Sequence, residues 1–130
     1  MSTPGGWTAA DLAAVDDTAE IHLASRRGDG TLRPSRIVWV VRHDDALYVR
    51  SVNGPGAVWY RGVQARHQGV VSADALQRDV TFVEADHTPD NALDDALDAA
   101  YRAKYGRGSA AVARITSTEA RRTTLRLDPA

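Results

Sequence analysis

The run from Arg36 to Arg42 constrains the fold more than any other segment of the chain. Its central residues, Ile37-Val38-Trp39-Val40-Val41, are β-branched or aromatic, and a basic residue stands at each end. Such residues favour a strand, and the absence of alternation with polar residues predicts that both of its faces are covered. His43-Asp44-Asp45 leads into a second apolar run, Ala46–Ser51. So short a connection predicts an antiparallel hairpin.

Shorter elements surround this hairpin. A helix is expected after Thr8, which can cap it, with Trp7 and Leu12 at the hydrophobic-staple positions. The longest helix is expected to open at Thr88-Pro89 and to end near Gly106. The remaining expected elements are strands over 20–25, 67–73 and 78–85, a short helix over 57–65, and a last strand or strand pair over 111–127. This order predicts one domain over residues 1–130, a six-stranded antiparallel β-barrel with flanking helices.

Composition excludes several classes of function. The chain of 130 residues has no cysteine, which excludes disulfides, thiolate metal sites and cysteine nucleophiles. A net charge of −1 gives no field to hold a polyanion, so a nucleic-acid partner is not expected. No apolar run approaches the length of a membrane span, and Met1–Gly6 lacks the features of a signal peptide. A cytoplasmic protein without a membrane partner is the expectation.

Histidines and paired charges give little sign of a reactive centre. His22, His43, His67 and His87 stand about twenty residues apart, without helical metal-ligand spacing, so no metal site is expected. A haem ligand from one of them stays open, with His67 a better candidate than His43. The doublets Arg26-Arg27 and Arg121-Arg122 are interpreted as solvated faces.

Two clusters are candidates for ligand binding. In Arg50-Ser51-Val52-Asn53-Gly54, a basic group, a hydroxyl and an amide precede a helix start, where free backbone amides favour an anion. The alternative is a strand end with solvated polar residues. Trp39, with Trp59 and Tyr60 on the short helix, can border a planar ligand; the alternative is packing in the core or at a dimer contact.

The segment from Arg36 to Glu84 resembles the flavin-binding split-barrel superfamily, the fold of pyridoxamine-phosphate oxidases and deazaflavin-dependent nitroreductases. The resemblance lies in a strand that starts with a basic residue, a strand that ends in a polar one, a glycine-containing bend, a short helix and two more strands. More closely, WVVRHDDALYVRSVNG, VWYRG and DVTFVEA are similar to the small family named domain of unknown function 2255.

This resemblance implies a homodimer that binds FMN or a deazaflavin at its interface and acts as an oxidoreductase on a small organic acceptor. Arg50, Ser51, Asn53 and Gly54 are implied to hold the cofactor's phosphate, with Arg61 as a further contact. The ring is implied to lie along the Arg36–Arg42 strand, bordered by Trp39 and Trp59. Tyr60 is a weak candidate for a proton donor, and no other catalytic residue is assigned.

One departure from the superfamily favours an alternative function. Pro55-Gly56-Ala57 stands where the superfamily often places Lys or Thr after the bend, which removes one phosphate ligand. The alternative is a non-enzymatic split barrel that binds haem or another small ligand, or a structural dimer without a cofactor.

Overall fold

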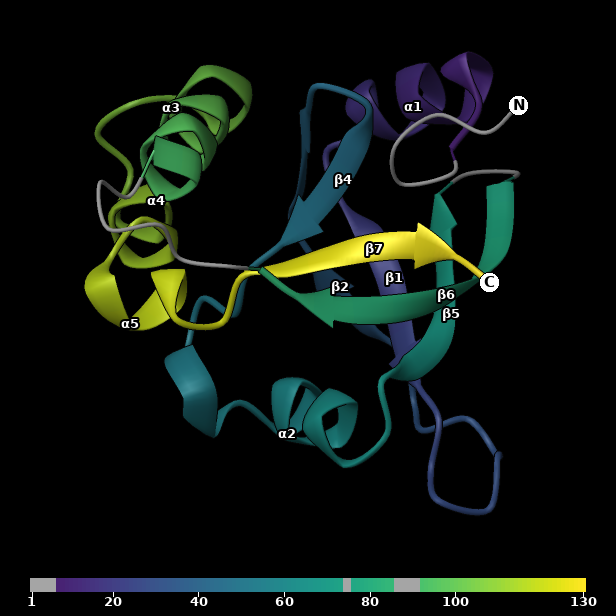
Figure 1. Ribbon diagram of the computed structural model, residues 1–130. Coiled ribbons are helices and arrows are strands. Elements are labelled where there is room, and N and C mark those ends of the chain that lie inside the picture. Colours follow the sequence, from purple (N-terminus) through teal and green to yellow (C-terminus); the bar gives the residue numbers. More distant parts are fainter. Residues whose placement is uncertain (1–6, 74–75, 86–91) are drawn as a thin grey trace.

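The computed structural model describes residues 7–73, 76–85 and 92–130, which form a nearly closed β-barrel with helices around it (Figure 1). The strands are β1 (Ile21–Ser25), β2 (Arg36–Val38), β3 (Val40–His43), β4 (Ala46–Val49), β5 (Gln68–Ala73), β6 (Leu76–Glu84) and β7 (Leu125–Pro129). The helices are α1 (Ala9–Asp16), α2 (Val58–Ala65), α3 (Ala92–Tyr105), α4 (Ala110–Ile115) and α5 (Thr118–Arg121), and a 3₁₀ turn covers Gly54–Gly56.

A single broken strand closes the barrel. The strand order is β2-β1-β5-β6-β7-β4-β3, and every pair is antiparallel. The two ends of this order, β2 and β3, are consecutive in the chain and are separated only by Trp39. They are the two halves of the strand predicted from Arg36 to Arg42. The predicted six-stranded antiparallel barrel is therefore confirmed, with one strand divided in two.

The C-terminal end of α3 stabilises the break at Trp39. The hydroxyl of Tyr105 accepts a hydrogen bond from the backbone N–H of Val40 at 3.1 Å. The ammonium of Lys104 donates to the Val40 carbonyl at 2.8 Å. The indole of Trp39 stacks on the Tyr105 ring, with centroids 4.0 Å apart and planes 3° from parallel. These contacts give the interrupted backbone its hydrogen-bond partners and fix the orientation of Trp39.

Two apolar cores explain why the broken strand lacks polar alternation. One core fills the barrel and includes Val40 together with Leu12 of α1 and Val63 of α2. The second lies between the β3–β4 hairpin and α3 and includes Val41 and Leu97. The expectation of two covered faces is thus confirmed for β3. It is wrong for β2, because the side chain of Ile37 is 56% exposed and does not belong to the core under α3.

Both ends of the chain show the effect of helix caps. As predicted, Thr8 caps α1, and its Oγ1 accepts from the N–H of Asp11 at 3.1 Å. Of the strand or strand pair expected over 111–127, a single last strand is present, β7; the early start is wrong, because α4 and α5 occupy the segment before it. Ser109 and Ser117 cap these two helices by accepting hydrogen bonds from backbone N–H groups in their first turns.

The long helix α3 ends as predicted, before Gly106, whose φ of +90° suits the position after a helix. Its expected start at Thr88-Pro89 lies outside the described residues, as do His87 and Met1–Gly6. Among the described helices, none has both the length and the apolar character that crossing a bilayer requires.

A buried guanidinium joins the barrel to the helical layer. The Arg50 side chain, directly after β4, has no exposed surface and pairs with Asp94 at 3.3 Å and Asp98 at 2.5 Å. Its Nε donates to Thr124 Oγ1 at 3.0 Å, and the carbonyls of Ile115 and Asp94 accept further hydrogen bonds. Asp98 also accepts from Arg121. We call Arg50, Asp94, Asp98, Arg121 and Thr124 the Arg50 cluster.

We predict that the Arg50 cluster contributes much of the stability of the helical layer. Asp98→Ala leaves a buried guanidinium without one of its carboxylates, and we expect the free energy of unfolding to fall by about 3–5 kcal/mol. Asp95→Ala is the matched control, because Asp95 pairs with Arg121 but is 66% exposed, and its expected loss is below about 1 kcal/mol. Urea unfolding of the two variants measures both values; equal losses would contradict the prediction.

The Tyr105 hydroxyl generates a second prediction. Tyr105→Phe leaves the N–H of Val40 without its acceptor, and we expect a loss of about 1–3 kcal/mol in unfolding free energy. Tyr48→Phe is the control, because the Tyr48 hydroxyl makes no hydrogen bond to the described residues. Its removal is expected to leave the unfolding free energy nearly unchanged. Thermal unfolding compares the two variants, and a Tyr48→Phe loss as large as that of Tyr105→Phe would refute the assignment.

Candidate functional site

A cavity of about 660 Å³ opens between β2 and the segment from the 3₁₀ turn into α2. We call it the tryptophan cleft. Its volume is within the range of small-molecule sites. It is lined by Glu20, Arg36, Ile37, Val38, Trp39, Arg50, Val52, Asn53, Gly56, Ala57, Val58 and Trp59.

The two tryptophans reach this cleft through local breaks in regular structure. Trp39 lies at the break between β2 and β3, and Tyr105 covers one of its faces. Gly54, with a φ of +74°, lets the chain turn into the 3₁₀ segment that precedes α2. Trp59 then lies in the first turn of α2, edge-on to the ring of Tyr60 at 6.0 Å. Both indoles are half-buried and held by neighbours, which suits them to contact a planar ligand.

A smaller cavity of about 280 Å³ adjoins the tryptophan cleft, and the two share Arg36, Val58 and Trp59 as lining residues. We call it the arginine pocket. Its other lining residues are Leu23, Ser25, Arg27, Arg33 and Pro34. They come from β1 and from the connection between β1 and β2. The two cavities form a continuous surface around Trp59.

The predicted phosphate site is not formed in this structure, and the placement of Arg50 is a correction. Its backbone lines the cleft, but its guanidinium is buried in the Arg50 cluster with all of its donors engaged. Ser51 is fully buried, and its hydroxyl has no partner among the described residues. A buried charge needs internal partners, and Asp94 and Asp98 supply them. A cofactor phosphate does not fit here.

The other two residues of that predicted site also differ from the expectation. Asn53 lines the cleft, but its side-chain oxygen accepts a hydrogen bond from Arg114. Gly54 lies against Glu119, whose carboxylate oxygen is 3.8 Å from the position of a Cβ built on the glycine. An acidic side chain beside Gly54 repels an anion.

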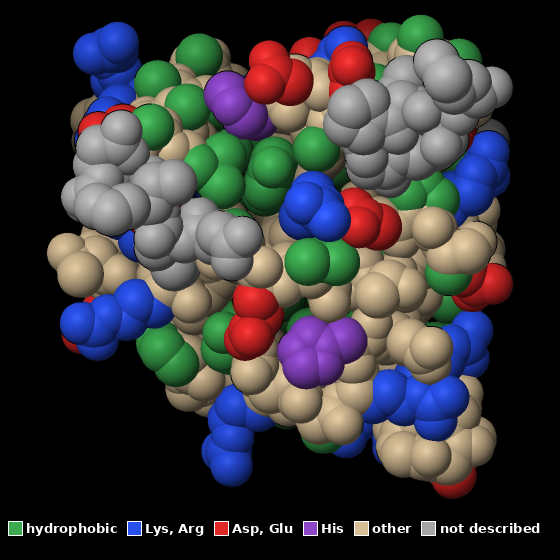
Figure 2. Space-filling model, viewed as in Figure 1, with side chains coloured by type: hydrophobic (Ala, Val, Ile, Leu, Met, Phe, Trp, Pro, Cys, Tyr) green, Lys and Arg blue, Asp and Glu red, His purple; other side chains and the backbone are tan. Residues whose placement is uncertain are grey.

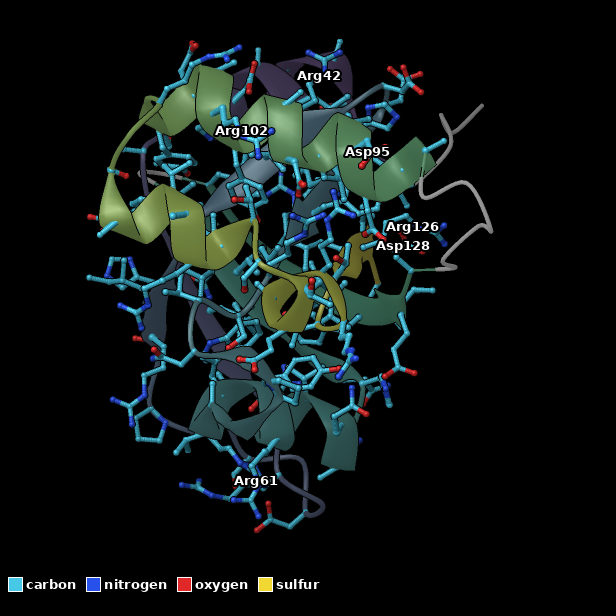
Figure 3. The ribbon with its side chains drawn as sticks, turned by 90° about the vertical axis from the view of Figure 1, so that its left-hand side faces the viewer. Arg42, Arg61, Asp95, Arg102, Arg126 and Asp128 are labelled. Carbon is cyan, nitrogen blue, oxygen red and sulfur yellow. The ribbon has the colours of Figure 1, made fainter. Side chains whose placement is uncertain are left out.

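Two predicted residues on α2 lie outside the cleft. Arg61 is exposed and lines neither cavity, and Figure 3 shows it at the outer side of α2. Tyr60 is only 8% exposed and belongs to the barrel core. Burial raises the pKa of the Tyr60 phenol, which makes it a weaker proton donor. Of the predicted residues, the structure therefore brings together the side chains of Arg36, Trp39, Asn53 and Trp59.

Sequence reasoning missed Arg27 and Arg33. The doublet Arg26-Arg27 is interpreted from the sequence as a solvated face, and Arg27 is indeed exposed, but it also lines the arginine pocket. Arg26 is partly exposed and pairs with Asp79 at 3.2 Å. Arg121 of the other doublet pairs with Asp95 and Asp98. The sequence contained a signal for this pocket, because Arg27, Arg33 and Arg36 all lie in or next to the one connection between β1 and β2.

The described histidines lie away from both cavities. His22, His43 and His67 are not among the lining residues, and His43 contacts the carboxylate of Asp44 at 3.6 Å. Within the described chain, neither cavity therefore presents a histidine as an axial ligand for haem.

Comparison with solved structures identifies the fold. HutZ, the haem storage protein from Vibrio cholerae, matches with a TM-score of 0.68 and 12% identity over 91% of this chain and 86% of its own. A putative pyridoxamine 5′-phosphate oxidase from Listeria innocua matches with a TM-score of 0.61 and 15% identity, over 91% and 89% of the two chains. A protein described as F420 reductase matches with a TM-score of 0.56 and 17% identity, over 91% of each chain.

These similarities confirm the expected fold, a split barrel with flanking helices. A search of curated proteins found no match. A family model described as an uncharacterized protein conserved in bacteria (DUF2255) matches residues 11–127. The chain belongs to this family, as its sequence motifs indicated.

Proposed function

We propose that this protein binds a flavin or deazaflavin ring in the tryptophan cleft and serves as an oxidoreductase for a small organic acceptor. The cleft supports this proposal because it combines two held indoles, apolar walls and one free guanidinium. Two of the similar split barrels, the pyridoxamine 5′-phosphate oxidase and the F420 reductase, are named for redox reactions, which agrees with it.

The chain's own residues would bind and orient the ring. Trp39 and Trp59 offer aromatic contact area, and Val38 and Ala57 add apolar contacts that exclude water. The Arg36 side chain makes no hydrogen bond or ion pair to the described residues, so its guanidinium is available for an electronegative edge of the ring. A bound flavin or deazaflavin supplies hydride-transfer chemistry.

Haem binding is the second candidate, because HutZ is named as a haem storage protein. Haem iron in proteins is usually held by an axial side chain such as histidine. The described residues around the tryptophan cleft include no histidine, cysteine, methionine or tyrosine. A flavin or deazaflavin needs no such ligand, so the cleft favours it.

We predict that FMN or a deazaflavin quenches the tryptophan fluorescence of the purified protein, whereas haem does not bind in a histidine-ligated form. Trp59→Leu is expected to weaken ring binding about tenfold, since stacking contacts contribute about 1 kcal/mol or more. Gln64→Ala is the control: Gln64 is exposed on the same helix and bonds to Glu84. Fluorescence titration measures the affinities. Absence of binding by all of these rings at tens of micromolar would refute the proposed function.

We also propose that the protein is a homodimer with the tryptophan cleft at its interface. Three large hydrophobic residues are exposed within the described chain, Leu32, Ile37 and Val58. Ile37 and Val58 both line the cleft, and Val58 is 68% exposed. A second copy that covered them would bury apolar surface and exclude water from the ring.

The dimer proposal predicts that the double variant Ile37→Asp, Val58→Asp is a monomer, so that its mass in solution falls from the dimer mass to the monomer mass. Charge introduced at a buried interface opposes association because it must be desolvated. Ala13→Asp, on the exposed face of α1, is the control and should leave the dimer intact. Light scattering after size exclusion gives the masses. A monomeric wild-type protein across the micromolar range would contradict the proposal.

A further inference from the structure

We propose that the arginine pocket binds an oxyanion group, a phosphate or a carboxylate, carried by the ligand whose ring lies in the tryptophan cleft. This inference deepens the proposed function and rests on it for the identity of the ring. The oxyanion site itself is argued from Arg27, Arg33 and Arg36, and it lies apart from the segment after β4 where the phosphate was expected.

The arginine pocket concentrates positive charge, although Asp29 interacts electrostatically with Arg27 from the same connection between β1 and β2. Arg27, Arg33 and Arg36 line it, and no acidic side chain is among its lining residues. The protein as a whole carries a net charge of −1. Acidic and basic side chains are mixed over the face seen in Figure 2. Three arginines in one concave pocket, with no acidic residue among its described lining, are therefore a local concentration, and such a field attracts anions.

The state of Arg33 is the second, independent observation. Its Nη1 is buried and has no hydrogen-bond partner among the described residues. Buried polar groups in proteins nearly always have partners, because a donor without an acceptor loses the hydrogen bonds that it made with water. The buried guanidinium of Arg50, by contrast, is fully engaged. A ligand oxyanion beside Arg33 would supply the acceptor that the protein does not.

The Arg33 side chain is positioned by packing. It crosses Gly62 of α2, where an added Cβ would lie 3.1 Å from both Cδ and Nε of Arg33. The same Cβ would lie 2.7 Å from the hydroxyl of Ser25. Gly62 therefore leaves the space that Arg33 occupies beside the helix. A guanidinium held in place before binding loses less conformational entropy when it meets an anion.

The two cavities are placed to receive one molecule. Arg36, Val58 and Trp59 line both, so a ring beside Trp59 has the arginine pocket next to it. In the segment after β4 the Arg50 guanidinium is already paired with Asp94 and Asp98, and Glu119 lies beside Gly54, which disfavours an anion there. The arginine pocket supplies the positive charge that an anionic ring ligand requires.

Direct binding of small anions tests the pocket without any ring. Pyrophosphate and citrate are titrated by calorimetry against the wild-type protein, Arg33→Ala, Arg33→Lys and Arg122→Ala. Arg122 is the control, since it is exposed and lines no described cavity of the barrel. We expect Arg33→Ala to weaken binding of the preferred anion about tenfold and Arg33→Lys to weaken it less, with Arg122→Ala unchanged. Gly62→Ala, which displaces Arg33, should weaken it as well.

Two results would overturn the inference: no binding of either anion, or equal weakening in Arg33→Ala and Arg122→Ala. The preferred anion shows whether the group is a phosphate or a carboxylate.

A second experiment compares FMN with riboflavin, which lacks the phosphate, and tests whether the pocket and the ring site hold one ligand. A preference for FMN that Arg33→Ala removes supports one ligand across both cavities. Equal binding of FMN and riboflavin to a pyrophosphate-selective protein contradicts that link and leaves the proposed function intact. Arg33-dependent anion binding without flavin or deazaflavin binding refutes the proposed function alone.

Discussion

The buried ion pairs of Arg50 determine how the rest of this small barrel is arranged. A guanidinium without exposed surface must be surrounded by acceptors, and here they come from α3, from the end of α4 and from the residue before β7. These contacts attach the helical layer to the barrel at the end of β4. They also remove from solvent the charge that the sequence had suggested for ligand binding.

The break between β2 and β3 at Trp39 determines where the indole of this residue lies in the tryptophan cleft. A continuous strand would have placed this residue in the regular alternation of the sheet. Instead Tyr105 and Lys104 bond to the backbone of Val40, and the indole stacks on Tyr105. The same helix therefore neutralises Arg50 through Asp94 and Asp98 and positions Trp39 through its last turn. The cleft depends on α3 although that helix contributes no lining residue.

Much of the fold could be predicted from the sequence, because it is encoded in local patterns. The apolar run around Val40, the turn after His43 and the cap at Thr8 each specify an element through their nearest neighbours. The helices after Ser109 and Ser117 were missed because short alanine-containing segments carry weak periodicity, and their caps are single serines. The site was harder, since the partner of an arginine depends on contacts between distant segments. Arg50 and Asp98 are 48 residues apart.

The contrast between Arg50 and Arg33 shows what distinguishes a structural cation from a binding one. Both are arginines next to strands, and neither carries a sequence signal that separates them. Arg50 has two carboxylates and several oxygen acceptors within the fold, so an added anion would have to displace them. Arg33 packs against Gly62, but one of its nitrogens is buried without an acceptor among the residues that the structure describes. In the arginine pocket a ligand oxyanion would supply an acceptor to this Arg33 nitrogen without displacing any carboxylate of the protein.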